Sequence, residues 1–383
     1  HQRSGKVPEP NRRNEMHDKQ FMKETLQDSA KAYQEGRLDR RTFLALCGAS
    51  GIALTAVMAG DAEAAADHVV MWNWGGQSEE CHSSAIGDAF TANTGKGLKF
   101  DTSGPLEGKI KEMVDSGNVT ADVADGDLFN AVSLGPTGHL EPIDYSVVSR
   151  DKTLPGYALE FGVSIILYGY AFVYDTKAYG DNPPQNWADF FDTAKFPGMR
   201  SLYKWANGSL EAALMADGVA GDALYPLDMD RALTKIQSIK EDSLYWGSGS
   251  EAHSMVVNGE VSMGMIWQNR GRNIENDTDG RYKLVNNQAM AMPGAYIVPK
   301  GNPAGSSVMQ FIATAQEVPA QLALLDCLGM TPSNPEAFGQ IPEDQQDYAI
   351  TSAKNIDKIV YNDPEWWGKN GGDAVNAFLD AIS

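Results

Sequence analysis

Gly162-Val-Ser-Ile-Ile-Leu-Tyr-Gly-Tyr-Ala-Phe-Val-Tyr-Asp175 is the most strand-like run of the chain, and we begin from it. Branched and aromatic residues dominate it and no proline interrupts it, so it predicts a long buried strand. A strand that is apolar on both faces is typical of a sheet covered by helices. We therefore expect the flanking sequence to supply both strands and helices.

Strand and helix patterns alternate before this run. They predict a strand over 68–74, a helix over 78–94 with Gly95 as its C-cap, a strand over 98–100, a helix over 108–116, and a strand over 121–126 that runs into a loop. This β-α-β-α-β order favours a parallel sheet with helices on its faces.

The alternation continues after the break at Asn182-Pro183-Pro184. We expect helices over 187–191, 210–217 and 228–239, strands over 201–203, 262–267 and 295–299, a helix or turn over 255–261, and one long helix over 306–328. No internal repeat or low-complexity tract is visible. The pattern predicts two α/β domains that are joined by strands.

An export signal precedes the first strand. Arg40 and Arg41 are followed by an uncharged run over 45–60 and by alternating small residues, Ala62-x-Ala64-x-Ala66. The run is shorter than the about 20 apolar residues that span a bilayer. The pattern is typical of a twin-arginine (Tat) signal that is cut after Ala64 or Ala66, behind a polar extension over 1–38. The alternative is a chance arginine pair before a membrane anchor. We expect a periplasmic protein.

Composition limits the partners of the exported part. Without residues 1–66 the chain keeps 21 basic and 42 acidic residues, and its about 317 residues suffice for two domains. Such an acidic surface repels nucleic acid and anionic membranes. It indicates either a salty habitat or attraction of cationic solutes. Cys47 lies at the start of the apolar run, which argues against a lipid anchor.

The sequence lacks the common catalytic and metal-binding motifs. No HExxH, CxxC pair, GxSxG or P-loop occurs, and the six histidines lack metal-ligand spacing. We therefore expect no enzyme, no cofactor, and histidines that are surface or satisfied polar residues. Only Cys81 and Cys327 follow the signal, and their spacing leaves open whether they pair.

Several strings resemble the extracellular solute-binding proteins of ABC importers, in the spermidine/putrescine-type branch. They cover nearly all of 68–335 in the order of the family, and they are Trp72-Asn-Trp-Gly-Gly76, Tyr168-Gly-Tyr-Ala-Phe-Val-Tyr-Asp175, Pro184-Gln-Asn-Trp-Ala-Asp-Phe190, Ala194-Lys-Phe-Pro-Gly198, Val257-Asn-Gly-Glu-Val-Ser-Met-Gly-Met-Ile-Trp267, Tyr296-Ile-Val-Pro-Lys-Gly301 and Gly329-Met-Thr-Pro-Ser333. Each string alone is weak, but together, after an export signal, they are specific.

The resemblance implies a two-lobed periplasmic-binding-protein fold (type II-like), in which each lobe is a mixed sheet covered by helices and the ligand cleft lies between. Lobe 1 would hold 67–172 and 298–330, lobe 2 would hold 173–297, and 331–383 would brace the two. Strands over 168–175 and 294–299 would form the hinge. The implied partners are an ABC permease and an ATPase in the inner membrane, and the protein would act as a monomer.

Ligands of α/β proteins lie beyond the carboxyl ends of the strands, which selects candidate binding residues. In lobe 1 these are Asn73, Trp74, Gly75, Gly76, Asp125, Asp127 and Phe129; in lobe 2 they are Lys204, Trp205, Trp246, Ser248, Trp267, Asn269 and Arg270. Tryptophan faces attract ammonium groups, and Trp74 and Trp267 also match cleft aromatics of the polyamine binders. For Trp205 and Trp246 core packing competes with this role. For Trp72 and Trp187 we expect core packing.

The chain departs from the polyamine binders where they hold a diamine. Their acidic pair is replaced by Lys204 and Trp205, and a later aromatic and aspartate are replaced by Met292 and Gly294. A buried ammonium without a counter-charge is disfavoured, and a buried arginine requires an acid. The departures favour a ligand with one amine and one acid, such as an amino acid, a γ-aminobutyrate-like or a betaine-like compound.

Each end of such a ligand has candidate partners. Trp74, Trp267 and Asp127 would face the amine, and Arg270, Ser248 or the amides of Gly75 and Gly76 would face the acid. Other interpretations remain open at this stage. Lys204 would instead neutralise Glu211 or Asp217, and Arg270 and Arg272 would form a solvated surface pair.

Three other functions compete with transport. An exported enzyme would use Asp125 and Asp127, an iron-binding protein of related fold would use Tyr168, Tyr170 and Tyr174, and a chemoreceptor partner would have the same lobes. The tyrosines alternate along one predicted strand, so their rings share a face, and we expect them to line the hinge or the core.

Overall fold

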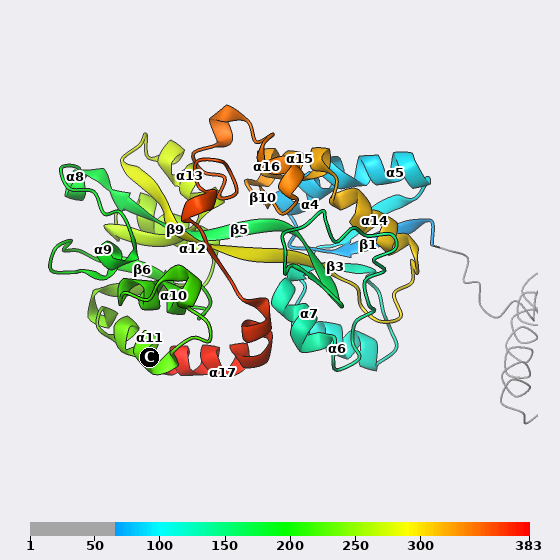
Figure 1. The fold of residues 1–383 in the computed structure, drawn as a ribbon, viewed down its shortest axis with the longest axis horizontal. Helices are drawn as coiled ribbons and strands as arrows, with labels where there is room; N and C mark the ends of the chain where they lie inside the picture. Colours follow the sequence, from blue (N-terminus) through cyan, green and yellow to red (C-terminus); the bar gives the residue numbers. More distant parts are fainter. Residues whose placement is uncertain (1–65) are drawn as a thin grey trace, which may run out of the picture. The chain divides into compact units, whose positions relative to one another are not determined.

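Two long antiparallel strands run through the middle of the structure (Figure 1). They are β5 (Gly162–Asp175) and β9 (Tyr282–Ile297), which pair from Val163/Tyr296 to Asp175/Tyr282, with irregularities between Ser164 and Ile166 and between Tyr170 and Phe172. The strand predicted over 162–175 is confirmed over its whole length, and nearly all of its residues are buried.

The computed structural model describes residues 66–383. The predicted signal sequence, with Arg40, Arg41 and Cys47, lies outside the described residues. Of the predicted cleavage motif only Ala66 is described. No helix within 66–383 is both long and apolar enough to cross a membrane.

All strands belong to one sheet with the order β2-β1-β3-β9-β5-β8-β6-β7. On the β9 side lie the parallel strands β2 (Gly97–Asp101), β1 (His68–Trp72) and β3 (Val123–Asp127). On the β5 side lie β8 (Met263–Trp267), β6 (Arg200–Tyr203) and β7 (Ser243–Trp246). The short strands β4 (Ala158–Leu159) and β10 (Thr331–Pro332) pair with β5, and β11 (Val360–Tyr361) pairs with β9.

Helices cover each end of this sheet, and we name the two ends after their strands. The β1 lobe contains α4 (Gln77–His82), a π-helical segment (Ser83–Gly87), α5 (Asp88–Thr94), α6 (Glu107–Asp115), α7 (Leu128–Leu134), α14 (Ser307–Ala315) and α15 (Val318–Leu328). The β8 lobe contains α8 (Thr176–Tyr179), α9 (Trp187–Phe191), α10 (Ser209–Ala216), α11 (Met229–Gln237), α12 (Gly249–Val257) and α13 (Gln268–Asp277). Each lobe has its own apolar core.

These cores contain the tryptophans that the sequence assigned to packing. Trp187 is fully buried and its indole N–H donates to the Gln288 carbonyl at 2.9 Å. Trp72 is buried and its N–H donates to Ser103 Oγ at 2.9 Å. Both predictions are confirmed, and the mixed α/β architecture is the predicted one.

Several predicted element boundaries were wrong. The helix predicted over 306–328 is two helices, because Glu317 is extended and Pro319 lies in the first turn of α15. The helix or turn predicted over 255–261 is the end of α12, which starts at Gly249. The loop expected after β3 is the helix α7, and the strand expected over 295–299 is the last part of the much longer β9.

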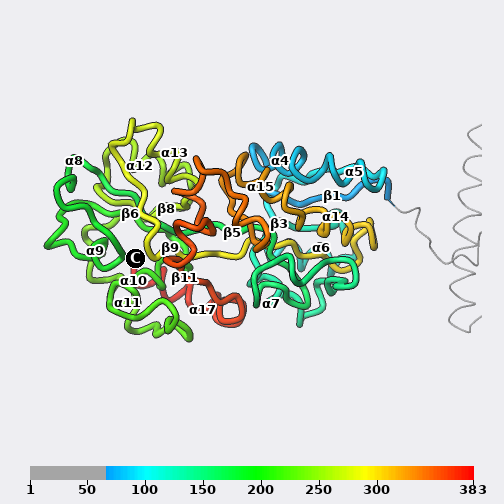
Figure 2. Tube along the Cα trace, turned by 45° about the horizontal axis from the view of Figure 1, so that its top comes forward, coloured from blue at the N-terminus to red at the C-terminus, as the bar shows by residue number. Residues whose placement is uncertain are grey.

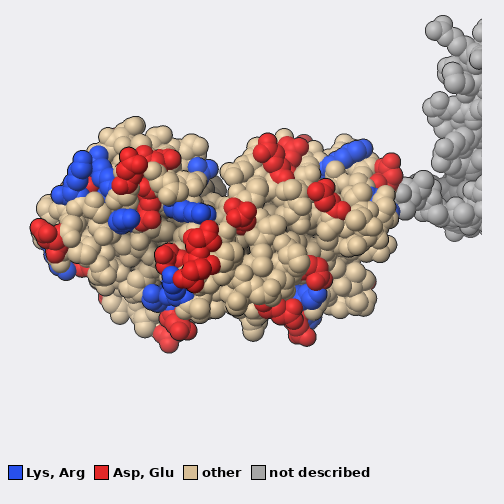
Figure 3. Space-filling model, turned by 90° about the horizontal axis from the view of Figure 1, so that it is seen from above, with Lys and Arg blue, Asp and Glu red and all other residues tan. Residues whose placement is uncertain are grey.

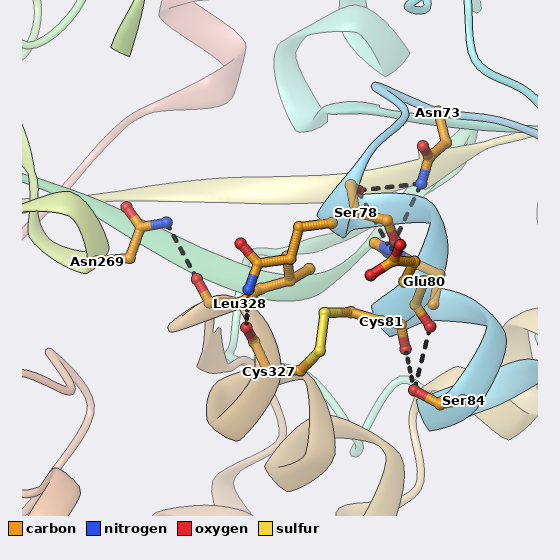
Figure 4. The surroundings of a disulfide bond; sticks show 10 residues. Asn73, Ser78, Glu80, Cys81, Ser84, Asn269, Cys327 and Leu328 are labelled. Carbon is orange, nitrogen blue, oxygen red and sulfur yellow. Dashed lines mark hydrogen bonds between the residues drawn. A yellow bond between two sulfur atoms is a disulfide. The ribbon is translucent and has the colours of Figure 1, made fainter. Parts of the chain in front are cut away.

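A disulfide joins Cys81 of α4 to Cys327 of α15, with Cα atoms 5.8 Å apart. Figure 4 shows that the end of α15 is also bound by side-chain amides. Gln77 donates to the Cys327 carbonyl at 2.8 Å, and Asn269 of the β8 lobe donates to the Leu328 carbonyl at 3.0 Å. The end of α15 is therefore a contact point between the lobes.

The C-terminal segment contacts both lobes on another side. Its helices are α16 (Pro335–Phe338) and α17 (Pro364–Ile382), and α17 packs against α7 of the β1 lobe and α11 of the β8 lobe (Figure 2). Buried Glu211 of α10 accepts hydrogen bonds from Trp367 at 2.8 Å and Asn362 at 3.3 Å. These contacts agree with a bracing segment, while the predicted domain boundaries stay a prediction.

Candidate functional site

Candidate residues follow the carboxyl ends of strands in both lobes. Figure 3 shows one face of the molecule, on which the surface narrows between the lobes and acidic and basic side chains are interspersed. Two large apolar side chains at strand ends are exposed: Trp74, which follows β1, is 57% exposed, and Trp205, which follows β6, is 50% exposed. Exposed indoles at the ends of strands are candidates for ligand contact.

Trp74 is held in place from two sides. Its indole N–H donates to the Asp125 carbonyl at 3.0 Å. Its ring lies over Gly104, where an added Cβ would come within 3.3 Å of the ring atoms. One ring face is therefore supported by backbone, while more than half of the residue remains exposed.

The turn after Trp74 is built by Asn73 and two glycines. Asn73 is fully buried, and its side-chain oxygen accepts from the backbone N–H of Gly75 at 2.7 Å. Gly75 and Gly76 have φ values of 72° and 58°, which side chains with a Cβ rarely adopt. Asn73 is thus a structural residue of the turn, because its surface is inaccessible to a ligand.

Asp127 lies at the end of β3 and faces the other lobe. Its Oδ1 accepts a 2.8 Å hydrogen bond from Tyr168 of β5. The pKa of Asp127 is raised to about 7, mainly by burial; the hydrogen bond from Tyr168 opposes the rise and the negative charge of Asp125 adds to it. No lysine or arginine of residues 66–383 pairs with it. It is a carboxylate that lacks a cation.

Asp127 borders an aromatic cluster formed by Tyr168, Tyr170, Tyr203, Trp246 and Trp267. Neighbouring ring centroids are 4.4 to 6.3 Å apart. Burial raises the pKa of Tyr203 to about 12, and the charge of Asp127 contributes to the rise, which places this carboxylate near the rings of the β8 lobe. A carboxylate beside aromatic faces is an arrangement that binds ammonium groups.

The members of this cluster differ in their access to a ligand. Trp246 is fully buried, stacks on Tyr203 at 4.4 Å and donates to the Met265 carbonyl, so the direct ligand contact predicted for it was wrong. Trp267 is half-buried, and its indole N–H donates to no acceptor among residues 66–383. Tyr203 was not among the predicted site residues, and Tyr168 and Tyr170 were expected to line the hinge or the core, with iron binding as the alternative.

Arg270 follows Trp267 on the first turn of α13. Both side chains lie over Gly249, where a Cβ would overlap Arg270 Nε and come within 2.7 Å of the Trp267 ring. Burial lowers the pKa of Arg270 from its ordinary value, and no acidic side chain of residues 66–383 forms an ion pair with it. It also lines a polar depression between α12 and α13.

Other candidates lie at the edges of this region. Ser248 is exposed and caps α12, where its Oγ accepts from the Glu251 N–H at 3.2 Å. Phe129 is half-buried at the start of α7, and Lys204 is exposed after β6. Asn269 binds the end of α15, so its amide is already occupied.

Two alternatives from the sequence are contradicted. Lys204 neutralises neither acid of its lobe, because Glu211 is bound by Tyr225, Asn362 and Trp367 and Asp217 pairs with Arg231. Arg270 and Arg272 are not a solvated pair. The Arg272 guanidinium lies over the Tyr348 ring, 4.1 Å from its centroid, while Arg270 is partly buried beside Trp267.

The described residues contain no group of three or more His, Cys, Asp or Glu side chains that could hold a metal ion. Of the tyrosines considered for iron, Tyr168 already binds Asp127, and Tyr170 is buried in the aromatic cluster. Asp125 and Asp127 both lie on β3, two residues apart. Within residues 66–383 the geometry offers a carboxylate without a cationic partner beside aromatic rings, and a partly buried arginine without an acidic partner.

Comparison with known proteins identifies the family of the chain and several similar structures. The sequence profile of the bacterial extracellular solute-binding proteins matches residues 85–351. The γ-aminobutyric acid-binding protein of Pseudomonas aeruginosa is 26% identical over 326 residues, which are 83% of this chain and 91% of that protein. The solved Atu4243–GABA receptor is 30% identical with a TM-score of 0.75, over 82% of this chain and 98% of the receptor.

A third similar structure is MotA from A. tumefaciens B6 in complex with glucopine. It is 26% identical with a TM-score of 0.73, over 83% of this chain and all 100% of MotA. The predicted fold class is confirmed by these binding proteins, whereas the spermidine/putrescine-type branch stays a prediction.

Proposed function

Because the chain belongs to the bacterial extracellular solute-binding protein family, we propose that it captures a small solute with one amine and one acid group in the periplasm and delivers it to an ABC permease. Amino acids, γ-aminobutyrate-like and betaine-like compounds are of this kind. The similarity to a γ-aminobutyric acid-binding protein and to a GABA receptor supports this class.

The position of Asp127 carries the proposal. Its carboxylate has a hydrogen bond from Tyr168 but no cationic partner among residues 66–383, and it lies beside aromatic rings. An ammonium group placed here gains a counter-charge and π-faces at the same time. Trp74 and Trp267 would contribute further aromatic surface from the two lobes.

Arg270 would bind the acid. Its guanidinium is partly buried and has no acidic partner within the described part of the chain, 66–383, which is costly unless a ligand supplies one. Arginine binds carboxylates with two parallel hydrogen bonds, so it would also orient the ligand. Ser248 and the backbone amide of Gly76 lie at strand ends of the two lobes and would assist, whereas the Gly75 amide predicted for this role already donates to Asn73 Oδ1 at 2.7 Å.

A diamine fits this site less well. It needs a carboxylate at each end, but the positions that would supply the second acid hold Lys204 and Trp205, both exposed. Lys204 would repel the second ammonium group.

Calorimetric titration at pH 8 with γ-aminobutyrate, glycine betaine, putrescine and spermidine tests the proposal. We expect heat of binding with one of the zwitterions and none with the diamine or triamine. Arg270→Ala should abolish zwitterion binding, while the matched surface variant Lys109→Ala should bind like the wild type. Tight binding of spermidine or putrescine, together with no response to zwitterions, would overturn the proposal.

Turnover and iron binding are the remaining outcomes. Recovery of the bound solute unchanged after prolonged incubation is expected of a transport protein. Conversion of the solute would favour an exported enzyme, and a coloured ferric complex would favour the iron-binding alternative.

A further inference from the structure

We propose that His82 is a positioning residue for the amine end of the ligand site, which acts from the interior of the β1 lobe through Asp125 on Asp127. The proposal rests on the function proposed above for Asp127. His82 itself is 2% exposed and contacts no ligand position directly. The sequence had placed it among ordinary surface or satisfied histidines.

One side of the imidazole is fixed by the turn that carries Trp74. Nδ1 lies 2.7 Å from the Ser78 carbonyl, which can only accept, so Nδ1 carries a proton. The side-chain amide of Asn73 donates to Ser78 Oγ at 3.0 Å, and Asn73 also binds Gly75. His82 is therefore tied to the residues that shape this turn, part of which Figure 4 shows.

The other side of the imidazole faces an acid. His82 Nε2 lies 4.0 Å from Asp125 Oδ2, and no hydrogen bond from residues 66–383 reaches Nε2. Tyr296, the neighbour of Asp125 across the β3–β9 pair, has a buried hydroxyl with no partner in the same part of the chain. Three polar groups thus share an apolar interior, where their interactions are strong.

Few titratable or charged groups surround the His82 side chain. β3 contributes Asp125 and β9 contributes Tyr296, whose ring centroid is 6.2 Å away. On α4 itself Glu79 is half-exposed and Glu80 exposed, α14 has no charged residue, and the only acid of α15, Asp326, is exposed. His82 consequently has Asp125 as its one buried acidic neighbour among these elements.

Asp125 connects this interior to the ligand site in two ways. Its carbonyl accepts the indole N–H of Trp74 at 3.0 Å, and its carboxylate lies on the same strand as Asp127. Burial raises the pKa of Asp125 and His82 lowers it, while the charge of Asp125 raises the pKa of Asp127. Without His82, Asp125 would stay protonated to higher pH and Asp127 would ionise more readily.

The test follows the Asp127 carboxyl by ¹³C NMR in the ligand-free full chain, with Asp127→Asn to assign its signal. We expect His82→Gln to lower the titration midpoint of Asp127 by about 0.5–1 pH unit. Asp125→Asn should lower it in the same direction, and the double variant should add nothing to Asp125→Asn. His139→Gln, which removes a histidine bonded to Asp115 elsewhere in this lobe, should leave the midpoint unchanged.

A purely structural role for His82 would lower the melting temperature but leave the midpoint of Asp127 unchanged, and that result would overturn the proposal. If His82→Gln does not fold, Asp125→Asn alone decides, because an unchanged midpoint there breaks the link to Asp127. Titration of zwitterions in the same variants is a separate readout. A shifted midpoint in a protein that binds no zwitterion would contradict the proposed function and leave only the link from His82 through Asp125 to Asp127 intact.

Discussion

The hydroxyl of Tyr168 donates a 2.8 Å hydrogen bond to Oδ1 of Asp127, and this bond joins the central strand β5 to the carboxyl end of β3. It orients the carboxylate toward the aromatic cluster without neutralising it. A tyrosine hydroxyl supplies one donor, whereas a carboxylate accepts several. Asp127 therefore keeps acceptor capacity for a bound ammonium group.

We predict that ligand affinity depends on pH through Asp127. Its pKa is about 7 in the free protein, and a bound ammonium favours the ionised form, so binding below this pKa must release a proton. Affinity should therefore rise with pH and level off above about 7, with a loss of up to about tenfold for each pH unit below it. Calorimetry between pH 5 and pH 8.5, in buffers of different ionisation enthalpy, measures both the affinity and the proton release.

The matched variants are Asp127→Asn and, at an exposed position, Asp151→Asn. Asp127→Asn should bind weakly and lose the pH dependence, while Asp151→Asn should retain both. The Asp127→Asn substitution should also stabilise the ligand-free protein above pH 7. The folded-state pKa of Asp127 exceeds its unfolded value, so this group lowers stability as pH rises from about 4 to about 7. An unchanged pH slope in Asp127→Asn would contradict the assignment.

Apolar periodicity predicted those helices and strands whose buried face is apolar. It did not predict the strands and helices that carry many polar side chains. The first half of the 16-residue strand β9 contains the polar residues Lys283, Asn286 and Asn287. For this reason it was not predicted as a strand. α13 is equally polar, and it forms because its Gly271 and Ile274 pack inside while the remaining residues bind neighbours. Both segments are stabilised by tertiary contacts, which no local pattern displays.

The candidate site was predictable only in part for a related reason. The rule of strand ends selected Asp127 and Trp267, which lie at the aromatic cluster. It also selected Trp74 and Arg270, whose part in a ligand site stays a prediction. It also selected Trp246, which is buried, because alternation along a four-residue strand does not show which face is covered. Tyr203 was missed since its role comes from stacking on Trp246, and the sequence separates these residues widely.

We predict that the Cys81–Cys327 disulfide stabilises the β1 lobe. It closes a separation of 246 residues and holds α4, which begins three residues after Trp74, against α15. Replacing both cysteines by serine should lower the free energy of unfolding by about 2–5 kcal/mol. Denaturant unfolding with and without reductant measures this loss, and the double variant should no longer respond to reductant. Equal stability of the two proteins under oxidising conditions would argue that the bond is absent.

We predict that Gln268 is a structural link between the lobes. Its side chain is fully buried, accepts from the Gly169 N–H at 2.6 Å and donates to the Gly329 carbonyl at 2.9 Å. Gln268→Leu keeps the volume but leaves two buried backbone groups without partners, which should cost about 2–4 kcal/mol of stability. Thermal and denaturant unfolding measure the cost. Gln310→Leu on the exposed face of α14 is the control, and a similar loss in both variants would refute the role of Gln268.

We predict that Gly249→Ala weakens ligand binding although it changes no charge and no polar group. A Cβ at this position would overlap Arg270 Nε and approach the Trp267 ring to 2.7 Å, so both side chains must move away from the start of α12. If Arg270 binds the acid of the ligand, its displacement should reduce affinity by at least about tenfold, because a charged hydrogen bond is worth roughly 1.5–3 kcal/mol.

Gly108→Ala is the matched control, since this glycine lies in α6 with no atom within 4 Å of the added Cβ. It should bind normally and gain about 0.5–1 kcal/mol of stability. Wild-type affinity in Gly249→Ala, measured by calorimetry at pH 8, would show that Arg270 and Trp267 lie outside the ligand site.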